Sequence, residues 1–477
     1  MKKFVRDYLY PAAAPVTGES YGTIVSYFMP EYVIVLILYS MPFLVDARWI
    51  ATLGSTDAYA SLGITNTLLH FIVKIIEGIS IGTIVLTGQA NGSQNYKNAG
   101  FTFVNSFWTM VFVGTVITTG LFFGAPYFFE WYGVSAQVTA YGIPFLRLRA
   151  IGIFFTCVYF ALVGFLKGIK KVRASMYIFM VGCAAFLVAD YGLIFGAWGF
   201  PELGVTGSAV ATITQYVLMC IIAFGYIFYS SDLRKYGVQI FSVFTTGRRM
   251  RELLLLSVPV MIDKAALAAS YVWLGKCLAP MGTEVLAGFS ALKEVERFTF
   301  LPGLALASVV TFMVSNAWAR EDWEGIKATI ARVMVTAAVM VFVLVLICCT
   351  YAYPLLSIFD KKGVFAGWTS EALPVLSVLI FLDLAQLLLS AALRGLSDVK
   401  TVMWTRLLVC AGFFVPVSYL FASLDISNVV LKFVLIYGSL YLADGIMTLI
   451  YVRRFSTDEW KIKQEKVDYG NNPRRSA

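Results

Sequence analysis

Twelve long apolar runs restrict this chain to one kind of environment. Each run has about 20 or more mostly apolar residues, the length that a helix needs to cross the hydrocarbon core of a membrane. The runs are too long for the strands of a membrane β-barrel. They cover residues 27–50, 59–86, 101–127, 138–166, 174–196, 205–229, 252–278, 284–314, 327–353, 370–393, 401–422 and 427–452. We therefore predict an all-α integral membrane protein with twelve transmembrane helices.

The composition agrees with a chain whose main partner is the lipid bilayer. Hydrophobic residues make up 59% of the chain and charged residues only 14%, against roughly 25% charged residues in soluble domains. This excludes a soluble enzyme, a disordered protein and a fibrous repeat. The net charge of +9 comes mostly from segments between the runs, so no nucleic-acid partner is expected.

Chemistry that needs a cofactor has little support in the sequence. The only histidine is His70, which excludes a two-histidine zinc motif and a bis-histidine haem site. The P-loop pattern GxxxxGK[ST] does not occur, so the chain has no ATP-driven engine of its own. We expect no metal and no cofactor apart from a coupling ion.

Basic residues alternate between the two sides of the predicted membrane. One side carries Lys2, Lys3 and Arg6, the cluster within 167–173, the linker 230–251 and the basic residues after 452; the other carries almost only Arg48, Lys276, Lys361 and Lys362. Lys and Arg concentrate in cytoplasmic loops. We therefore expect both termini in the cytoplasm, and we place this multi-pass chain in the cytoplasmic membrane of a bacterium.

The two halves of the chain resemble each other. Residues 166–186 and 393–413 are identical at seven of 21 positions at an offset of 227, and the same offset pairs Gln89-Ala90 with Asn316-Ala317. Six helices per half give both halves the same orientation and a pseudo-two-fold axis along the membrane normal. The predicted units are a cytoplasmic segment 1–26, an N-lobe 27–229, a cytoplasmic linker 230–251, a C-lobe 252–452 and a cytoplasmic tail 453–477.

Three short motifs, in order along the chain, resemble the MATE (multidrug and toxic compound extrusion) family. They are FLVD at 43–46 followed by Leu53-Gly54, GVTGSAVAT at 204–212, and LRGLSD at 393–398. The resemblance implies alternating access between two lobes and export driven by inward flow of Na⁺ or H⁺. It makes the chain a secondary antiporter for organic, cationic or amphipathic compounds, and we expect a monomer.

The resemblance implies an ion site in the N-lobe. Asp46 matches the aspartate that binds the coupling ion or proton, Asp190 matches a second carboxylate, and Thr212 matches a hydroxyl nearby. The family carries Asn one turn before Asp190, where this chain has Phe186, and the missing oxygen ligand favours H⁺ over Na⁺. Asp46 has an alternative reading as an outer-interface residue paired with Arg48. Pro30 and Pro42 are the expected hinges of the first helix, because proline removes a backbone hydrogen bond.

A second ion site is implied in the C-lobe. Asp383 lies eleven residues before Arg394, like the helix-ten aspartate of one branch of the family, but the partner glutamate of that branch is replaced by Leu267. Asp263 lies one turn before Leu267 and is a candidate substitute for that glutamate. Lys264 beside it is an alternative neutralising partner for Asp383.

Further charges inside the predicted helices are candidates for a substrate cavity. Lys74 and Glu77 share a helix face with His70, and either line the cavity or neutralise each other. Asp263, Lys264 and Glu31 are the other candidates for this cavity; Glu31 follows Pro30 and has no more specific role. Lys293, Glu294, Glu296 and Arg297 are expected to pair within their own helix, and we expect the following charges near helix ends: Arg147, Arg149, Arg406, Lys432 and Asp444.

Two other functions stay open. The embedded cations suit an anionic headgroup or organic acid, as in an exporter of organic anions or a flippase for lipid-linked glycans; these cations are Lys74, Lys264, Lys293 and Arg297. Flippases of this kind commonly have fourteen helices, which argues against that reading. A membrane-embedded enzyme is disfavoured, because no nucleophile and base are placed together in the sequence.

Overall fold

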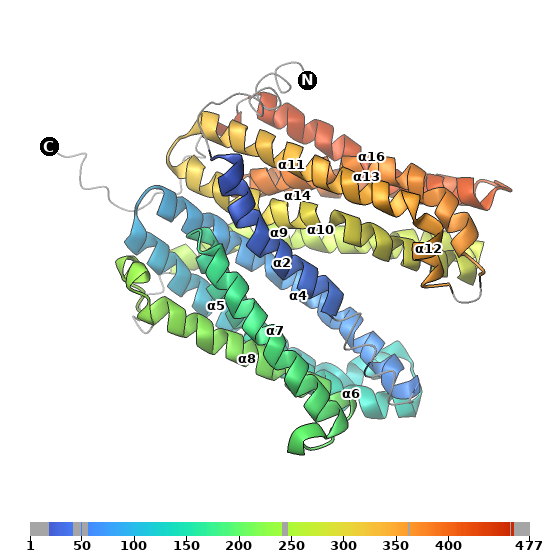
Figure 1. Cartoon of the computed structure of the whole chain (residues 1–477), viewed down its shortest axis with the longest axis horizontal. Coiled ribbons are helices and arrows are strands. Elements are labelled where there is room, and N and C mark those ends of the chain that lie inside the picture. The colour runs from blue at the N-terminus through green and yellow to red at the C-terminus, as the bar shows by residue number, and fades with distance from the viewer. Residues whose placement is uncertain are drawn as a thin grey trace.

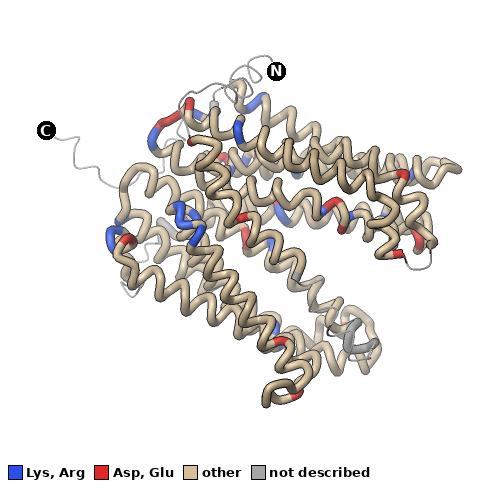
Figure 2. Tube along the Cα trace, viewed as in Figure 1, with Lys and Arg blue, Asp and Glu red and all other residues tan. Residues whose placement is uncertain are grey.

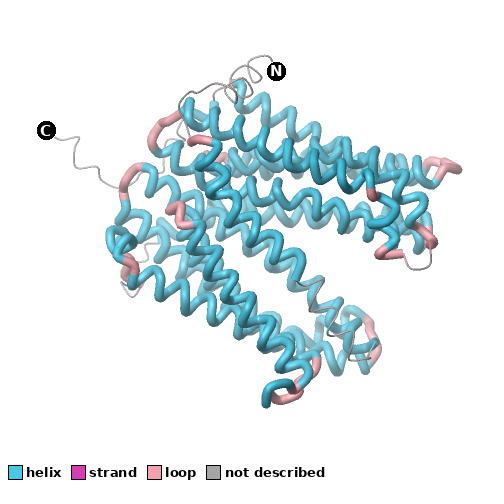
Figure 3. Tube along the Cα trace, in the orientation of Figure 1, coloured by secondary structure: helices cyan, strands magenta, loops and turns pink. Residues whose placement is uncertain are grey.

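A computed structural model describes residues 19–41, 49, 56–240, 247–360, 363–457 and 459–461 of the chain. Within these residues every regular element is a helix (Figure 3). The first half contains α2 (Tyr21–Met41), α4 (Thr56–Gly92), α5 (Tyr96–Tyr132), α6 (Ala136–Gly168), α7 (Val172–Phe195) and α8 (Val205–Tyr229). The second half contains α9 (Gly247–Leu278), α10 (Thr283–Ala319), α11 (Trp323–Thr350), α12 (Ala352–Ser357), α13 (Ala366–Gly395), α14 (Val399–Val409), α15 (Val415–Ser423) and α16 (Val429–Ser456).

The predicted number of membrane-spanning helices is confirmed for the described residues. Twelve helices are long and apolar enough to cross a membrane, and the eleventh is α14 and α15 joined through the π-helical turn Cys410–Phe414. Several begin at side chains that accept a hydrogen bond from the first helical turn, which satisfies amides that have no partner within the helix. These capping residues include Asn95, Ser135, Asp322 and Asn428.

The helices form two bundles that diverge toward one end (Figure 1). α4 to α8 lie in one bundle, and α9 to α16 lie in the other. The bundles approach each other where α4 turns into α5, and they are far apart where α6 begins and where α12 lies. α2 runs between them and packs on α7 of the first bundle and on α10 of the second. We call the bundles the N-lobe and the C-lobe.

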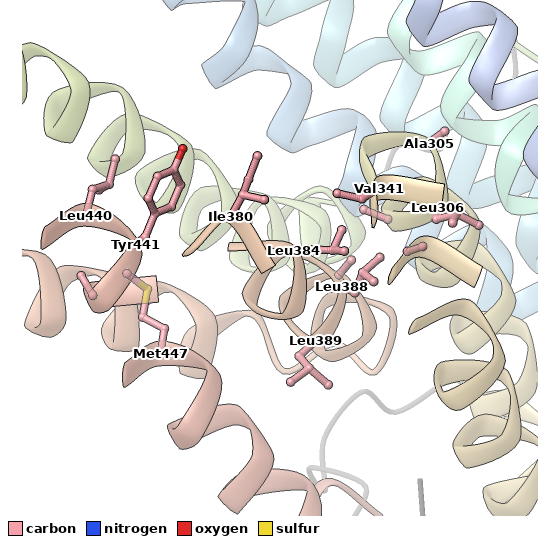
Figure 4. Close-up of a cluster of buried hydrophobic side chains, with 14 of the residues drawn as sticks. Ala305, Leu306, Val341, Ile380, Leu384, Leu388, Leu389, Leu440, Tyr441 and Met447 are labelled. Carbon is pink, nitrogen blue, oxygen red and sulfur yellow. The ribbon is translucent and has the colours of Figure 1, made fainter. Parts of the chain in front are cut away.

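Each lobe has its own apolar core. In the C-lobe, Ile380, Leu384 and Leu388 of α13 recur at four-residue spacing and so lie on one helix face. They belong to the same buried cluster as Leu306 of α10 and Val341 of α11, as Figure 4 shows. These apolar contacts position the few charged side chains that enter the lobe.

The lobes meet through polar contacts at the end where they converge. The Asn316 amide of α10 donates to the Gly168 carbonyl at 2.9 Å, and its Oδ1 accepts from Asn91 of α4 at 2.7 Å. Gln89 donates to the Ser397 hydroxyl at 2.8 Å. α4 comes this close because Gly92 has no side chain: a Cβ there would lie 2.1 Å from the Asn316 carbonyl oxygen.

This junction gives a prediction for Asn316→Ala. The substitution removes two hydrogen bonds between the lobes and leaves their partners unsatisfied, a loss of about 1–3 kcal/mol. We expect a shift of about 5- to 150-fold toward conformations in which this end is open. Spin labels on the α4–α5 and α10–α11 turns measure the shift as a longer distance in a pulsed electron resonance experiment.

Asn105→Ala is the matched control, because Asn105 is also buried but its amide donates to the Phe101 carbonyl of its own helix at 2.8 Å. An unchanged distance distribution in Asn316→Ala would contradict the role of this junction.

Candidate functional site

Three buried charges from three helices of the C-lobe are in direct contact. Asp263 of α9 accepts from Nη2 of Arg394 on α13 at 2.6 Å and from Nε of Arg406 on α14 at 2.5 Å. All three side chains are buried, and Asp263 is only 2% exposed. Because one carboxylate receives two guanidinium groups, Asp263 is the centre of an ion network inside the lobe.

Two more carboxylates lie within reach of this network. Nη1 of Arg406 is 4.0 Å from Oδ1 of the buried Asp444 on α16. Asp383 of α13 interacts electrostatically with Arg406 and with Asp444. Three carboxylates therefore share two guanidinium groups, and one negative charge is left over when all five groups are ionised (3 − 2 = 1).

A further carboxylate lies beside this group. Glu296 of α10 is buried and accepts hydrogen bonds from the hydroxyls of Tyr437 and of Tyr441, the latter at 2.9 Å. The sequence predicted that Glu296 pairs within its own helix, which is wrong. Of these four residues, Glu294 and Arg297 form an intrahelical pair, whereas Glu296 lies on the face of α10 that is turned toward Tyr437 and Tyr441 of α16.

Other predictions for the charges of the C-lobe also need correction. Arg406 and Asp444 lie inside the lobe, where each contacts an opposite charge, and not at helix ends beside water. Lys264 forms its ion pair with Glu77 of the N-lobe and not with Asp383: its Nζ is 3.9 Å from Oε2 of Glu77. Adjacent residues of a helix diverge by about 100°, so Asp263 and Lys264 make their ion pairs with different partners.

The N-lobe contains the predicted Asp190 and Thr212. Asp190 of α7 is fully buried. Thr212 of α8 accepts a hydrogen bond from Nη1 of Arg149 at 2.6 Å, and its neighbour Ala211 shares a buried cluster with Ala189. The expectation that Arg149 lies near a helix end is wrong, since it reaches from α6 into this lobe. Asp46 and Pro42 lie outside the described residues.

Pro30 lies within α2, and the helix continues through it. The next residue, Glu31, is 1% exposed and accepts from Nζ of Lys167 on α6 at 2.8 Å. Glu31 therefore does not line a cavity, as the sequence predicts, but forms a buried ion pair, because the face of α2 that bears it packs on the N-lobe. Glu31 and Lys167 fix the middle of α2 against α6.

The facing surfaces of the two lobes hold the remaining predicted residues. Oε2 of Glu77 on α4 is 3.2 Å from Nζ of Lys74, in addition to its contact with Lys264. The exposed fraction of the side chain is 35% for Glu77, 29% for Lys74 and 21% for Lys264. A pocket of about 370 Å³ lies beside them; its lining residues are Phe71 of α4 and, from α9, Ala268, Ala269, Val272, Trp273 and Lys276.

The comparisons with known proteins agree with this fold. The family model MatE matches the chain twice, at residues 32–191 and 259–420. The two matches start 227 residues apart (259 − 32 = 227), the offset found between the halves of the sequence.

Curated relatives cover most of the chain. A "Probable multidrug resistance protein NorM" of Xylella fastidiosa is 24% identical over 372 residues, covering 76% of this chain and 77% of its own. A protein of the same name from Synechocystis is 24% identical over 386 residues, covering 79% and 82%. A solved structure described as the outward-facing conformation of a multidrug resistance MATE family transporter of the MOP superfamily superposes with a TM-score of 0.82 at 18% identity, covering 91% of this chain and 95% of the other. That structural likeness concerns the fold alone.

Proposed function

Because this chain belongs to the MatE family, whose model matches more than half of its length, we propose that it exports small organic compounds in exchange for protons by alternating access between its lobes. The names of the curated relatives support export of drug-like compounds. The relatives are described as resistance proteins, which favours this reading over a membrane-embedded enzyme. The twelve spanning helices favour it over a glycan flippase with fourteen.

The surplus carboxylate in the C-lobe is the observation that carries proton coupling. Asp263 takes the direct contacts of both guanidinium groups, so Asp383 and Asp444 share what remains of the positive charge of Arg406. Two carboxylates in one buried site do not ionise together cheaply. One proton on Asp383 or Asp444 balances the charge of these three carboxylates and two guanidinium groups, and we assign the coupling proton to this pair.

Proton binding drives the cycle only if the two conformations of the lobes bind the proton with different affinity. Asp383 is less buried than Asp263 and Asp444, so it is the group through which the proton enters from the space between the lobes. Pro30 weakens α2 at its middle, where a bend would alter its packing on α7 and α10. Export follows when protonation favours the conformation that releases substrate outward.

We place the converging end of the lobes in the cytoplasm. Lys and Arg gather at that end, as Figure 2 shows. The end of α6, the turn after it and the segment after α8 contain Lys167, Lys170, Lys171, Arg234 and Lys235. The positive-inside rule then makes this an outward-open arrangement. The same argument supports termini on the cytoplasmic side, and we propose that one chain suffices for transport.

The test is transport by purified protein in liposomes, with a pH gradient and a Na⁺ gradient imposed separately. Fluorescent compounds of both charges serve as substrates: ethidium as a cation and carboxyfluorescein as an anion. We expect wild-type transport with the pH gradient alone. Asp383→Asn removes the proton site, so we expect its gradient-driven transport to fall to that of empty liposomes.

Asp190→Asn is the matched comparison, because it removes a buried carboxylate of the N-lobe. Loss of coupling in Asp190→Asn with normal coupling in Asp383→Asn would move the proton site to the N-lobe carboxylates, Asp46 and Asp190. Transport driven only by the Na⁺ gradient would overturn proton coupling. Transport of none of the compounds would overturn export itself.

A further inference from the structure

A cluster of charged side chains lies where the two lobes face each other, and basic groups outnumber acidic ones in it. We call it the inter-lobe basic cluster; its members are Lys74 and Glu77 of α4, Lys264 of α9, and Lys293, Glu294 and Arg297 of α10. Four cations face two carboxylates, so the cluster has a surplus of two positive charges (4 − 2 = 2). Lys74 of α4 and Arg297 of α10 both contact Tyr39 of α2, which brings these two cations to either side of one residue.

The contacts inside the cluster leave positive charge unbalanced. The single carboxylate of Glu77 serves both Lys74, at 3.2 Å, and Lys264, at 3.9 Å. Lys74 also donates to the Tyr39 hydroxyl at 3.2 Å, and the Arg297 guanidinium lies 5.3 Å from the centre of the Tyr39 ring. The ammonium of Lys293 lies over the rings of Tyr271 and Phe289.

The position of the cluster requires a functional explanation. Lys74, Lys264 and Arg297 lie near the middle of α4, α9 and α10, and their side chains are 29%, 21% and 30% exposed. A cation at the centre of a bilayer costs roughly 2.5–3.5 kcal/mol, so such residues face the interior of a bundle or a water-filled space. These three therefore line the surface between the lobes.

An apolar pocket continues from the cluster along the same two helices. The pocket of about 370 Å³ is lined by Phe71, which lies three residues before Lys74 on α4, and by a stretch of α9 that starts at Ala268, four residues after Lys264. Residues at these spacings lie on the same helix face. Further along α9, Trp273 adds an aromatic side chain. A ligand with a charged end and an apolar body fits both features at once.

We propose that this surface binds an amphipathic organic anion. Its carboxylate, sulfonate or phosphate contacts Lys74 and Lys264, and its apolar body lies against Phe71 and Trp273. Glu77 occupies the two lysines when the ligand is absent and competes with it for them. This rests on the proposed export function and adds the charge class of the substrate; an anionic lipid headgroup presents the same chemistry as a soluble organic acid.

The first experiment measures binding of carboxyfluorescein to the purified full-length protein by fluorescence anisotropy. A charge-assisted hydrogen bond contributes enough that its loss weakens binding by about 10- to 150-fold, and we expect this for Lys264→Met. Glu77→Gln should bind the dye more tightly than wild type, because the competing carboxylate is gone. A purely structural role for the cluster does not raise affinity in this way.

Lys432→Met is the matched control, because Lys432 is a partly buried lysine of a spanning helix, α16, outside the cluster. Its dye affinity should equal that of wild type. Thermal unfolding of each variant checks that the fold is intact. Failure of the wild type to bind carboxyfluorescein, or equal affinity in wild type, Lys264→Met and Glu77→Gln, would overturn the proposal.

Transport in liposomes of neutral phosphatidylcholine separates the two sources of the anion. Export of carboxyfluorescein that Lys264→Met reduces supports a soluble organic anion. Translocation of a fluorescent phosphatidylglycerol with the same sensitivity supports a lipid headgroup. Transport of ethidium without either anion would overturn the anionic site and leave proton-driven export standing.

Discussion

Asp263→Asn should strongly lower the stability of the C-lobe. The change leaves the guanidinium groups of Arg394 and Arg406 buried without the carboxylate that contacts both. Removing one partner of a buried ion pair costs about 3–5 kcal/mol, because the remaining charge has lost its compensation. We expect a lower yield of folded protein and a reduced midpoint of thermal unfolding in detergent.

A double variant tests the electrostatic origin of this loss. Asp263→Asn combined with Arg406→Gln keeps the net charge of the network unchanged, so its loss of stability should be smaller than the sum of the two single losses. The difference is a coupling energy of about 0.5–3 kcal/mol, the range for residues in direct contact. Additive losses would show that the three side chains do not act as one network.

Glu31→Gln should produce the second large effect, at the junction of α2 and α6. The substitution leaves Lys167 with a neutral partner in a place where Glu31 is 1% exposed, and the ammonium 2.8 Å away loses its counter-charge. We expect a loss of about 3–5 kcal/mol in stability. Because Glu31 follows Pro30, the loss should also loosen the middle of α2, seen as faster amide hydrogen exchange there.

Asp232→Asn is the control for this prediction. Asp232 forms an ion pair of similar length, 3.0 Å, with Lys171, but the two side chains are 68% and 37% exposed. An exposed ion pair contributes about 0–1 kcal/mol, since water and salt screen it. Equal losses in Glu31→Gln and Asp232→Asn would show that burial is not what makes the Glu31 contact strong.

The number and order of the spanning helices could be read from the sequence. In lipid a segment has to satisfy its own backbone hydrogen bonds, so a run of about 20 apolar residues specifies a helix almost without reference to the rest of the chain. The offset of 227 between the halves could also be read from the sequence, because residues 166–186 and 393–413 share identical positions. Gly168 and Gly395 are one such pair, and each ends a helix at a close approach to a neighbouring helix.

The contact partners of the charged residues could not be predicted from the sequence. Asp263 was found as a candidate, but its contact with Arg406 joins residues 143 apart, and the contact of Glu31 with Lys167 joins residues 136 apart. Helical periodicity gives the face on which a side chain lies and says nothing about which helix covers that face. For this reason the sequence left Asp263 and Lys264 as alternative partners of Asp383, although Lys264 contacts Glu77.

The amino-acid sequence by itself thus determined a twelve-helix membrane protein of duplicated halves and a short set of charges that lipid does not tolerate. Only the tertiary structure decided how those charges are used. Packing of α9 against α14, together with the ion pair that Arg394 of α13 forms with Asp263, placed Asp263 between two arginines and left Asp383 and Asp444 with a surplus negative charge. Packing of α4 against α9 brought Glu77 between two lysines at the surface where the lobes meet. Electrostatic energy depends on distance in space, and separation along the chain does not specify it.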